Sequence, residues 1–430
     1  MGLSENVGVG LLGCGTVGSS VVRLLAESRD EIAERSGCLF EVVRVAVRDD
    51  ERPRDVPLPP EAFTTDASAV VAEPGVQVVL EVMGGAEPAR SLILDALAGG
   101  KSVVTANKEL LANHGAELFE AAAKGETDLL FEAAVAGGIP IIRPLRESLA
   151  GERITRILGI VNGTTNYILT RMSEDGTSFS DALVDAQRLG YAEASPEADV
   201  EGFDAAAKCA ILASLAFGTP VVASDVYREG ISRVSGEDIG FAARLGYDVK
   251  LLAVAELEDE QVAVRVHPAM IPRDHPLAAV RDAFNAVFVE GPHIGQLMFY
   301  GPGAGGDPTA TAVVGDLVDA GTRLIRGSRG FVSPYHAERV IRPMDAMETQ
   351  YYLLLDVLDR PGVLARLAGA FGDNGVSIKS VWQEGTGDDA LIVIITHRAN
   401  EGAVQQTVTD LRALDVVLEV RSVMRVAGEE

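Results

Sequence analysis

Residues 7–25 read VGVGLLGCGTVGSSVVRLL, and this stretch decides the fold of the first part of the chain. Residues 7–12 form a short apolar run typical of a buried strand, and an apolar-periodic helical pattern follows the glycines. Between them lies the pattern G-x-G-x-x-G, which in another context would be a plain tight turn. In a dinucleotide-binding loop, Gly13 permits the turn, Gly15 lets the pyrophosphate approach, and Gly18 lets the helix pack on the strand.

The alternation of apolar runs and helical patterns continues to about residue 140. Further strands are expected at 41–47, 76–82, 101–105 and 129–134, with helices at 89–98 and 109–123. Repeated strand–helix units of this kind predict an α/β domain with a parallel, Rossmann-type sheet. Residues 1–140 are therefore interpreted as an NAD(P)-binding domain.

The end of the second strand bears on the choice of cofactor. It runs into Arg48-Asp49-Asp50. An acidic residue at this place would hold the ribose hydroxyls of NAD, whereas an arginine can pair with the 2′-phosphate of NADP. Because Arg48 comes first, the sequence favours NADP, with Arg54 as a weaker helper, while Asp49 leaves NAD open.

The ends of two later strands carry further candidate ligand-binding residues. Lys108 follows Thr105-Ala106-Asn107 at a strand-to-helix junction, where ligands bind in parallel sheets. A solvated lysine at a helix start is the alternative. Glu132 opens a glycine-rich exit from the domain, and a carboxylate with backbone carbonyls could bind a cation there.

The pattern changes from about residue 141. A strand at 153–161 enters the turn-forming cluster NGTTN at 162–166, and the segments that follow mix helices and strands. The expected helices lie at 167–172 and 180–189, and the expected strands at 249–257, 261–268, 286–290 and 295–300. Residues 141–325 are interpreted as an α+β domain for substrate binding, catalysis and dimerisation. The glycine-dense stretch 301–309 is either a close approach to a cofactor or a long turn.

Residues 190–218, GYAEASPEADVEGFDAAAKCAILASLAFG, hold the main catalytic candidate. An acid-rich loop leads into a helix that is apolar nearly all round, which indicates burial. Asp204 and Lys208 are spaced i,i+4, so both lie on one face of that helix. The spacing alone leaves two readings open: a structural ion pair, or a catalytic lysine oriented by Asp204 beside acids that bind an amino group.

The C-terminal part divides into a linker and a small domain. Residues 326–349 lack a sustained period and read as the linker. Residues 350–430 show the order β-α-β-β-α-β, with strands expected at 351–357, 377–382, 391–396 and 416–423 and helices at 361–371 and 403–414. This order predicts a ferredoxin-like binding or regulatory domain.

Composition narrows the class of protein. The 430 residues carry a formal net charge of −26, which argues against binding to nucleic acid or to an anionic membrane. Three distant cysteines indicate neither a disulfide framework nor a zinc site. No leader pattern or apolar membrane span is evident, so a cytoplasmic enzyme or binding protein is expected.

These motifs together resemble homoserine dehydrogenase with a C-terminal ACT domain, in its monofunctional form, over essentially the whole chain. The segments that carry the resemblance are the glycine loop at 13–18, TANK at 105–108, NGTTN at 162–166, GYAE at 190–193, EGFDAAAK at 201–208, the glycine loop at 301–306 and DRPGVL at 359–364. The resemblance implies reversible NAD(P)H-dependent reduction of L-aspartate 4-semialdehyde to L-homoserine, in threonine, methionine and isoleucine biosynthesis. It also implies a homodimer or homotetramer, with feedback inhibition by threonine through the ACT domain as a hypothesis.

The resemblance also assigns roles to residues of this sequence. Lys208 is the expected proton donor to the aldehyde oxygen, and Lys108 is expected beside the nicotinamide and the substrate. The residues expected to bind the substrate are Gly190, Glu193, Asp199 and Asp204. Those expected at the cofactor are Gly13, Gly15, Thr16, Val17, Gly18, Arg48, Thr105, Lys108 and Gly303. A monovalent cation, sodium, is expected at Glu132 and the backbone of Val135, Gly137 and Ile139.

Two other functions compete with this interpretation. A semialdehyde dehydrogenase would share the cofactor fold but act through a cysteine thioester, for which Cys209 is the nearest candidate. A non-catalytic amino-acid sensor would use the ACT-like domain for its ligand and the nucleotide fold as a scaffold. The lysine and the acids at 193–208 favour the dehydrogenase over both.

Overall fold

The computed structural model describes residues 5–328, 333–385 and 388–427. The chain divides into two compact units, each made of three stretches. Unit 1 is Met1–Ile157, Ala207–Asp225 and Asn285–Arg339, and unit 2 is Leu158–Ala206, Val226–Phe284 and Val340–Glu430. The domain boundaries inferred from the sequence stay predictions. Within the described ranges, no helix is long and apolar enough to cross a membrane.

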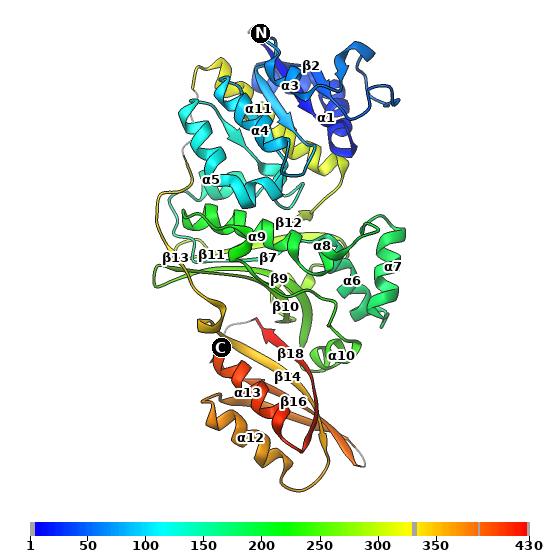
Figure 1. Cartoon of the computed structure of the whole chain (residues 1–430), viewed down its shortest axis with the longest axis vertical. Helices are drawn as coiled ribbons and strands as arrows, with labels where there is room; N and C mark the ends of the chain where they lie inside the picture. The colour runs from blue at the N-terminus through cyan, green and yellow to red at the C-terminus, as the bar shows by residue number, and fades with distance from the viewer. Residues whose placement is uncertain (1–4, 329–332, 386–387, 428–430) are drawn as a thin grey trace. The chain divides into compact units, whose positions relative to one another are not determined.

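Unit 1 is built on a six-stranded parallel sheet in the order β3-β2-β1-β4-β5-β6. Figure 1 shows this sheet among the helices of unit 1. The strands are β1 (Glu5–Leu12), β2 (Cys38–Ala46), β3 (Phe63–Thr64), β4 (Val78–Glu81), β5 (Ser102–Thr105) and β6 (Leu129–Leu130). The strand order reverses between β1 and β4, because the chain winds outward from β1 to β3 on one side and from β4 to β6 on the other, and such a reversal is where doubly wound sheets bind nucleotides. The Rossmann-type fold expected from the sequence is confirmed.

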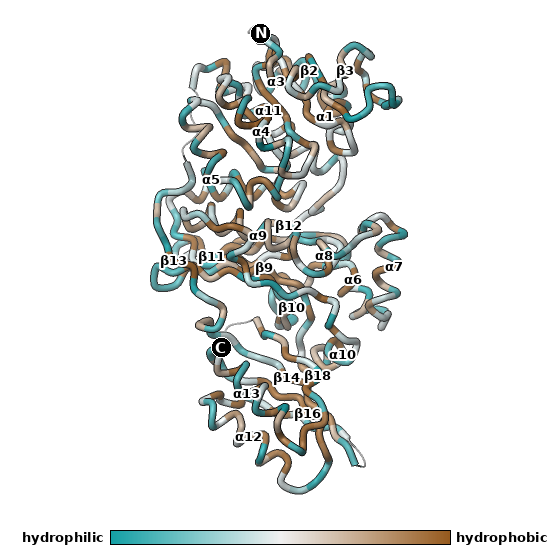
Figure 2. The backbone as a smooth tube through the Cα atoms, in the orientation of Figure 1, coloured by the Kyte–Doolittle hydropathy of each residue, from teal (hydrophilic) through white to brown (hydrophobic). Residues whose placement is uncertain are grey.

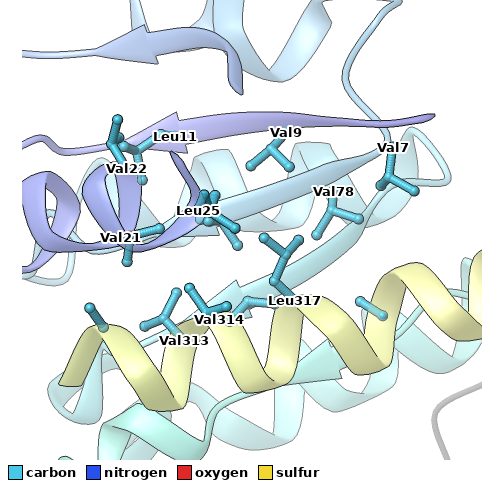
Figure 3. Packing of buried hydrophobic residues seen from close by; sticks show 14 of the residues in the cluster. Val7, Val9, Leu11, Val21, Val22, Leu25, Val78, Val313, Val314 and Leu317 are labelled. Atoms are coloured by element: carbon cyan, nitrogen blue, oxygen red, sulfur yellow. The ribbon is translucent and has the colours of Figure 1, made fainter. Parts of the chain in front are cut away.

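A helix from late in the chain completes the core of this sheet. The helices of unit 1 are α1 (Thr16–Glu27), α2 (Arg29–Ser36), α3 (Ala67–Ala72), α4 (Ala89–Ala98), α5 (Lys108–Lys124) and α11 (Gly306–Ile325). Figure 3 shows Val313, Val314 and Leu317 of α11 packed toward α1 and β1. Leu317 and Val313 are fully buried, and each such side chain contributes about 1.5–3 kcal/mol to stability. The nucleotide fold thus depends on a segment about 300 residues from its glycine loop.

One strand prediction in unit 1 needs correction, and one strand was not predicted. The strand expected at 129–134 ends at Leu130, and residues Glu132–Ala134 form a 3₁₀ turn instead. The chain turns here because the Glu132 carboxylate accepts three backbone N–H groups further along the exit segment. Strand β3 was missed because it has only two residues, too few for a recognisable pattern.

Unit 2 contains a long antiparallel pair of strands covered by helices. Strands β9 (Tyr247–Glu258) and β10 (Gln261–Pro272) pair over their whole length, and helices α6 and α10 pack on β9. The other helices and strands of this region are α6 (Gly163–Glu174), α7 (Phe179–Arg188), α8 (Glu197–Val200), α10 (Gly236–Arg244) and β8 (Tyr227–Arg228). The expected turn at 162–166 is wrong in part, because α6 already begins at Gly163 with Asn162 as its N-cap. Helix α10 was not expected.

Several elements link these regions along the chain. Helix α9 (Phe203–Phe217) passes from unit 2 into unit 1, and β7 (Arg156–Ile160) passes from unit 1 into unit 2. Strands β11 (Phe284–Gly291) and β12 (Gly295–Pro302) are neighbours and lie almost wholly in unit 1. The segment expected as a linker contains the short strand β13 (Val340–Ile341), which pairs with β10.

The C-terminal part of unit 2 has the expected ferredoxin-like, ACT-type fold. Its elements are β14 (Glu348–Leu358), α12 (Val363–Asp373), β15 (Ile378–Glu384), β16 (Asp389–Thr396), β17 (Ala399–Asn400), α13 (Glu401–Ala413) and β18 (Val417–Val426). The main strands lie in the order β18-β14-β16-β15. Leu367, Phe371 and Leu411 of the two helices pack on the buried side of this sheet. In Figure 2 the strands here are largely brown, as expected for a sheet with a covered apolar face.

Candidate active site

The first glycine loop leaves the start of α1 open. Gly13 has a φ of +101°, and a Cβ on Gly18 would lie 2.2 Å from the Gly13 carbonyl oxygen. A Cβ on Gly15, by contrast, would meet nothing within 4 Å. Gly15 is also the N-cap of α1 and provides no side-chain cap. The N–H groups of the first turn, at Thr16 and Val17, are therefore available to a phosphate.

Two further glycine-rich segments of unit 1 lie against this loop or against each other. Gly306 packs on Thr16 and Ser20 of α1, and Ser20 Oγ donates to Asp307 Oδ1 at 2.7 Å. A Cβ on Gly137 would lie 2.4 Å from the Gly303 carbonyl oxygen, so these two glycines touch. The structure thus brings together the three segments that the sequence predicted to bind the cofactor and the cation, at 13–18, 132–139 and 301–309.

A buried carboxylate organises the strand ends beside Lys108. Glu81, at the end of β4, is fully buried. Its carboxylate accepts hydrogen bonds from the backbone N–H groups of Met83 and Gly84 and from Thr105 Oγ1. Thr105 Oγ1 accepts the N–H of Asn107, and Asn107 caps α5 and donates to the Gly85 carbonyl at 2.7 Å. Lys108 is the first residue of α5, with a half-buried side chain. Sequence reasoning missed the roles of Glu81 and Asn107.

The candidate residues for the adenosine end of the cofactor are exposed. Arg48 and Asp49 follow β2, and the Asp49 carboxylate accepts the N–H groups of Glu51 and Arg52. Arg54 donates to the carbonyl oxygens of Asp49 and Arg52. Arg54 is therefore occupied in holding the loop, whereas the side chain of Arg48 extends from it without a hydrogen bond to any described residue.

Asn162 gathers the acids of the substrate region. Its Nδ2 donates to Asp199 Oδ1 at 2.7 Å and to Asp204 Oδ2 at 2.9 Å, which uses both amide hydrogens. Thr164 Oγ1 donates to the Tyr191 carbonyl and lies 3.2 Å from Asp199 Oδ2. Asn162 and Thr164 are almost completely buried. Both stood in a motif, but the sequence assigned them no role.

The remaining substrate candidates surround this cluster along the chain. Asp204 and Lys208 lie one turn apart on α9, and both side chains are half-buried. Glu193 is exposed in the loop before α8, and its carbonyl oxygen accepts Gln187 Nε2 at 3.0 Å. Gly190 has a φ of +79°, which allows the chain to turn after α7.

Cys209 does not offer an accessible nucleophile. Its side chain is only 1% exposed, although it neighbours Lys208 in sequence. A thioester mechanism requires a thiolate that the substrate can reach. The structure therefore gives no support to the semialdehyde dehydrogenase alternative.

The candidate cation segment is held by charged groups of unit 1. The Glu132 carboxylate accepts the N–H groups of Ile141, Ile142 and Arg143 at 2.6–2.9 Å. The Glu132 N–H donates to Asp316, which also pairs with Arg143 at 3.0 Å. Burial raises the pKa of Asp316 to about 7, and the nearby Glu132 charge adds to that rise. Glu132 Oε2 accepts only one of the three bonds, so it keeps acceptor capacity for a cation.

Comparisons with known proteins identify the family. Family models described as homoserine dehydrogenase, as its NAD binding domain and as an ACT domain match residues 140–318, 13–132 and 351–416. The homoserine dehydrogenase of Mycobacterium tuberculosis is 51% identical over 438 residues, covering 99% of each chain. The chain belongs to the homoserine dehydrogenase family. It is thus an NAD(P)-dependent oxidoreductase with an ACT domain, as the sequence predicted.

Solved homoserine dehydrogenases share the fold. The crystal structure of a homoserine dehydrogenase from Thiobacillus denitrificans has a TM-score of 0.94 and 42% identity, covering 98% of each chain. A hyperthermophilic archaeal homoserine dehydrogenase in complex with NADPH has a TM-score of 0.64 and 29% identity, covering 76% of this chain and 100% of its own. The Thiobacillus denitrificans structure covers nearly the whole of this chain, so its likeness extends over both the Rossmann-type and the ACT-type folds.

Proposed function

We propose that this homoserine dehydrogenase interconverts L-aspartate 4-semialdehyde and L-homoserine at a site organised by Asn162, with Lys208 as the proton donor. The observation that carries the proposal is the pair of hydrogen bonds from Asn162 Nδ2 to Asp199 and Asp204. They fix two carboxylates close to the start of α9, the helix that bears Lys208. Fixed carboxylates complement the ammonium group of an amino-acid substrate, and Glu193 and Gly190 complete that pocket in the proposal.

The proton chemistry follows from the lysine. A bound nicotinamide supplies the hydride. As the aldehyde is reduced, negative charge develops on its oxygen, and the Lys208 ammonium stabilises that charge and donates one proton to form the hydroxyl. In the reverse direction the neutral amine of Lys208 accepts the hydroxyl proton of homoserine. A positioned acid of this kind accelerates a reaction by about 10²–10⁴-fold.

Two residues support Lys208 in this scheme. Asp204 lies four residues earlier on the same face of α9, so its carboxylate can orient the ammonium group. Lys108 begins α5 at the carboxyl end of β5, where a parallel sheet presents ligands, and is proposed beside the nicotinamide and the substrate.

NADP is the proposed cofactor, with NAD as the alternative. The phosphates would bind the open start of α1 at Gly13–Gly18, beside Gly303 and Thr105. Arg48 supports NADP because its exposed guanidinium follows β2 and could pair with a 2′-phosphate. The archaeal relative bound to NADPH is consistent with this choice.

Sodium is the proposed cation at the exit of the nucleotide domain. Glu132 Oε2 and the carbonyl oxygens of Val135, Gly137 and Ile139 would hold it, since hard monovalent cations prefer oxygen ligands. Support comes from the contact between Gly137 and Gly303, which places this segment against the proposed cofactor loop.

Three broader expectations rest on the family rather than on contacts within the chain. Threonine is the proposed feedback inhibitor, acting through the ACT domain matched at 351–416. A homodimer or homotetramer and a cytoplasmic location are proposed with it.

The proposal is tested by homoserine-dependent reduction of NADP and of NAD, measured side by side. Lys208→Ala should lower kcat by about 10²–10⁴-fold. The matched control is Lys124→Ala, because Lys124 is a surface lysine paired with Glu120 at 2.7 Å, and this variant should turn over like the wild type. Full activity of Lys208→Ala, or loss of activity in Cys209→Ala alone, would overturn the assignment.

A further inference from the structure

The carboxylate of Glu81, at the end of β4, is a fully buried charge. Its three hydrogen bonds come from neutral donors, the N–H groups of Met83 and Gly84 and the hydroxyl group of Thr105. Among the residues that the structure describes, no lysine, arginine or histidine pairs with it. Buried charges in proteins are usually paired with an opposite charge, so Glu81 is unusual.

Two other buried carboxylates of unit 1 follow the usual rule. Asp128 pairs with Arg323 at 3.4 Å, and Asp316 pairs with Arg143 at 3.0 Å. A buried charge that is left without a partner lowers the stability of a protein. The position of Glu81 therefore points to a positive partner that binds from outside the chain.

Glu81 lies beside the loop proposed to bind the pyrophosphate. The turn that its carboxylate holds packs on that loop, because a Cβ on Gly13 would lie 3.0 Å from the Met83 Cα. By contrast, a Cβ on Gly84 or on Gly85 would meet nothing within 4 Å, and both residues are exposed. The turn thus has one side against the glycine loop and another side open to a ligand.

The order of the strands favours the nicotinamide as that ligand. Strand β1 lies between β2 and β4, and Arg48, after β2, is the proposed partner of the 2′-phosphate. A dinucleotide that spans the switch point between β1 and β4 must then extend its other end over β4 and β5. Thr105 Oγ1 donates to Glu81 and accepts the N–H of Asn107, the residue before Lys108. Glu81 is therefore linked to the strand end where the nicotinamide is proposed.

The charge of Glu81 distinguishes the two forms of the cofactor. An oxidised nicotinamide ring carries one positive charge, whereas a reduced ring carries none. A negative charge fixed below the ring favours the oxidised form, and at the effective dielectric constant of a protein site the dissociation constant changes by about tenfold or more. The same negative charge stabilises the positive charge that develops on the ring as the hydride leaves for the aldehyde carbon.

We propose that Glu81 is the counter-charge of the oxidised nicotinamide ring. Its carboxylate stabilises the complex with NADP⁺ relative to the complex with NADPH, and so favours hydride transfer toward the aldehyde. The inference rests on the proposed function, because it uses the placement of the cofactor at the start of α1.

The test compares the dissociation constants of NADP⁺ and NADPH, measured by calorimetric titration of the full-length protein without an amino acid. Glu81→Gln removes the charge and keeps an oxygen that can accept the two N–H groups. It should weaken NADP⁺ binding by about tenfold or more and change NADPH binding by less than about threefold. Glu81→Asp keeps the charge, so the ratio of its two constants should stay close to that of the wild type. A purely structural role of Glu81 would weaken both forms equally.

Two controls separate the charge from the fold. Glu126→Gln removes a carboxylate from an exposed position beyond the far end of α5 from Lys108, and it should leave both constants unchanged. Without cofactor, Glu81→Gln should unfold at the temperature of the wild type or higher, because a buried charge without a protein partner is removed. Failure of Glu81→Gln to fold, equal weakening of NADP⁺ and NADPH, or no change in either would overturn the inference.

A cofactor fragment distinguishes this inference from the proposed function. The probe is 2′-phospho-ADP-ribose, which lacks the nicotinamide and should bind the wild type and Glu81→Gln equally. If the wild type binds the fragment and both cofactors but Glu81→Gln keeps the ratio of the two constants, only the role of Glu81 is wrong. If the wild type binds neither the fragment nor the cofactors, the proposed placement of the cofactor is wrong, and the role of Glu81 with it.

Discussion

Two helices in this protein, α1 and α6, each follow directly on a β-strand, but their N-cap residues differ in chemistry. At β1–α1 the N-cap is Gly15, which has no side chain and leaves the helix start open. At β7–α6 the N-cap is Asn162, whose Oδ1 accepts the Thr165 N–H at 2.9 Å while Nδ2 holds two carboxylates. One helix start is thus open, as the proposed binding of an anionic cofactor requires, whereas the other is capped by a side chain that also holds the two acids proposed to bind the substrate ammonium.

The largest expected effect comes from giving the uncapped start of α1 a side-chain cap. Gly15 has an extended backbone, with φ −86° and ψ −150°, which an asparagine can adopt as an N-cap. Gly15→Asn should cap α1 and fill the space where the pyrophosphate approaches. The KM for NADP should rise by about 100-fold or more, equivalent to about 3 kcal/mol, while thermal stability is unchanged or higher. Steady-state kinetics and thermal unfolding measure the two quantities, and an unchanged KM would contradict the assignment of this loop.

A second prediction concerns Lys250, a buried lysine that contacts helix α6. Lys250 is 2% exposed and donates to Asn166 Oδ1 at 3.1 Å and to the Val280 carbonyl. Burial, with a smaller contribution from Arg281, lowers the pKa of Lys250 to about 8. Because the unfolded chain keeps the proton up to about pH 10.4, it binds more protons than the folded protein between these values. The free energy of unfolding should therefore rise with pH across this window, by about 2–3 kcal/mol.

Denaturant unfolding at pH 7.5–10.5 tests that sign. Lys250→Met should lose the rise, whereas Lys379→Met, at an exposed position on β15, should keep it. A parallel pH profile for the wild type and Lys250→Met would show that Lys250 does not titrate in this range.

A smaller effect is expected from removing the side chain of Asn162, the N-cap of α6. Asn162→Gly preserves an acceptable N-cap, so the helix should lose only a few tenths of a kcal/mol. It removes the donor shared by Asp199 and Asp204, so the KM for homoserine should rise by about tenfold, with little change in the KM for NADP. Ser178→Ala, which removes the N-cap of α7, is the control for cap loss and should not alter either KM. An unchanged KM for homoserine in Asn162→Gly would contradict the role of the cluster.

The smallest effect concerns the far end of the cofactor. Arg48 is exposed, and an exposed charge pair contributes only about 0.5–1 kcal/mol. Arg48→Ala should lower kcat/KM for NADP by about fivefold and leave kcat/KM for NAD unchanged. Equal changes with both cofactors would indicate that Arg48 does not bind the 2′-phosphate.

The same comparison explains how much could be predicted from the sequence. The glycine loop could be recognised because its physics is local: Gly13, Gly15 and Gly18 lie within six consecutive residues, and Gly18 packs directly on the Gly13 carbonyl. Asn162 could not be placed, because its partners lie 37 and 42 residues away and only the fold brings them together. Its N-cap role had a local signal in Asn-Gly-Thr-Thr, but the cluster of five turn formers favoured a loop.

The fold shows the same division between local and distant effects. Most of the succession of strands and helices along unit 1 and the ferredoxin-like pattern could be predicted, because periodicity and turn residues are local properties. The packing of α11 on β1 and α1 could not, since an apolar helix face does not specify its partner. Strand β6 ended early because the Glu132 carboxylate captured backbone N–H groups nine to eleven residues further on.

The central claim is that the cofactor binds at the start of α1 and the substrate binds near the start of α6. Its most direct test is the dissociation constant of NADPH, measured by fluorescence titration without an amino acid. The wild type and Asn162→Gly should bind NADPH equally, and Gly15→Asn should bind it about 100-fold more weakly or not at all. Equal weakening in both variants, or normal binding by Gly15→Asn, would contradict the assignment of the cofactor to the start of α1 and the substrate to the start of α6.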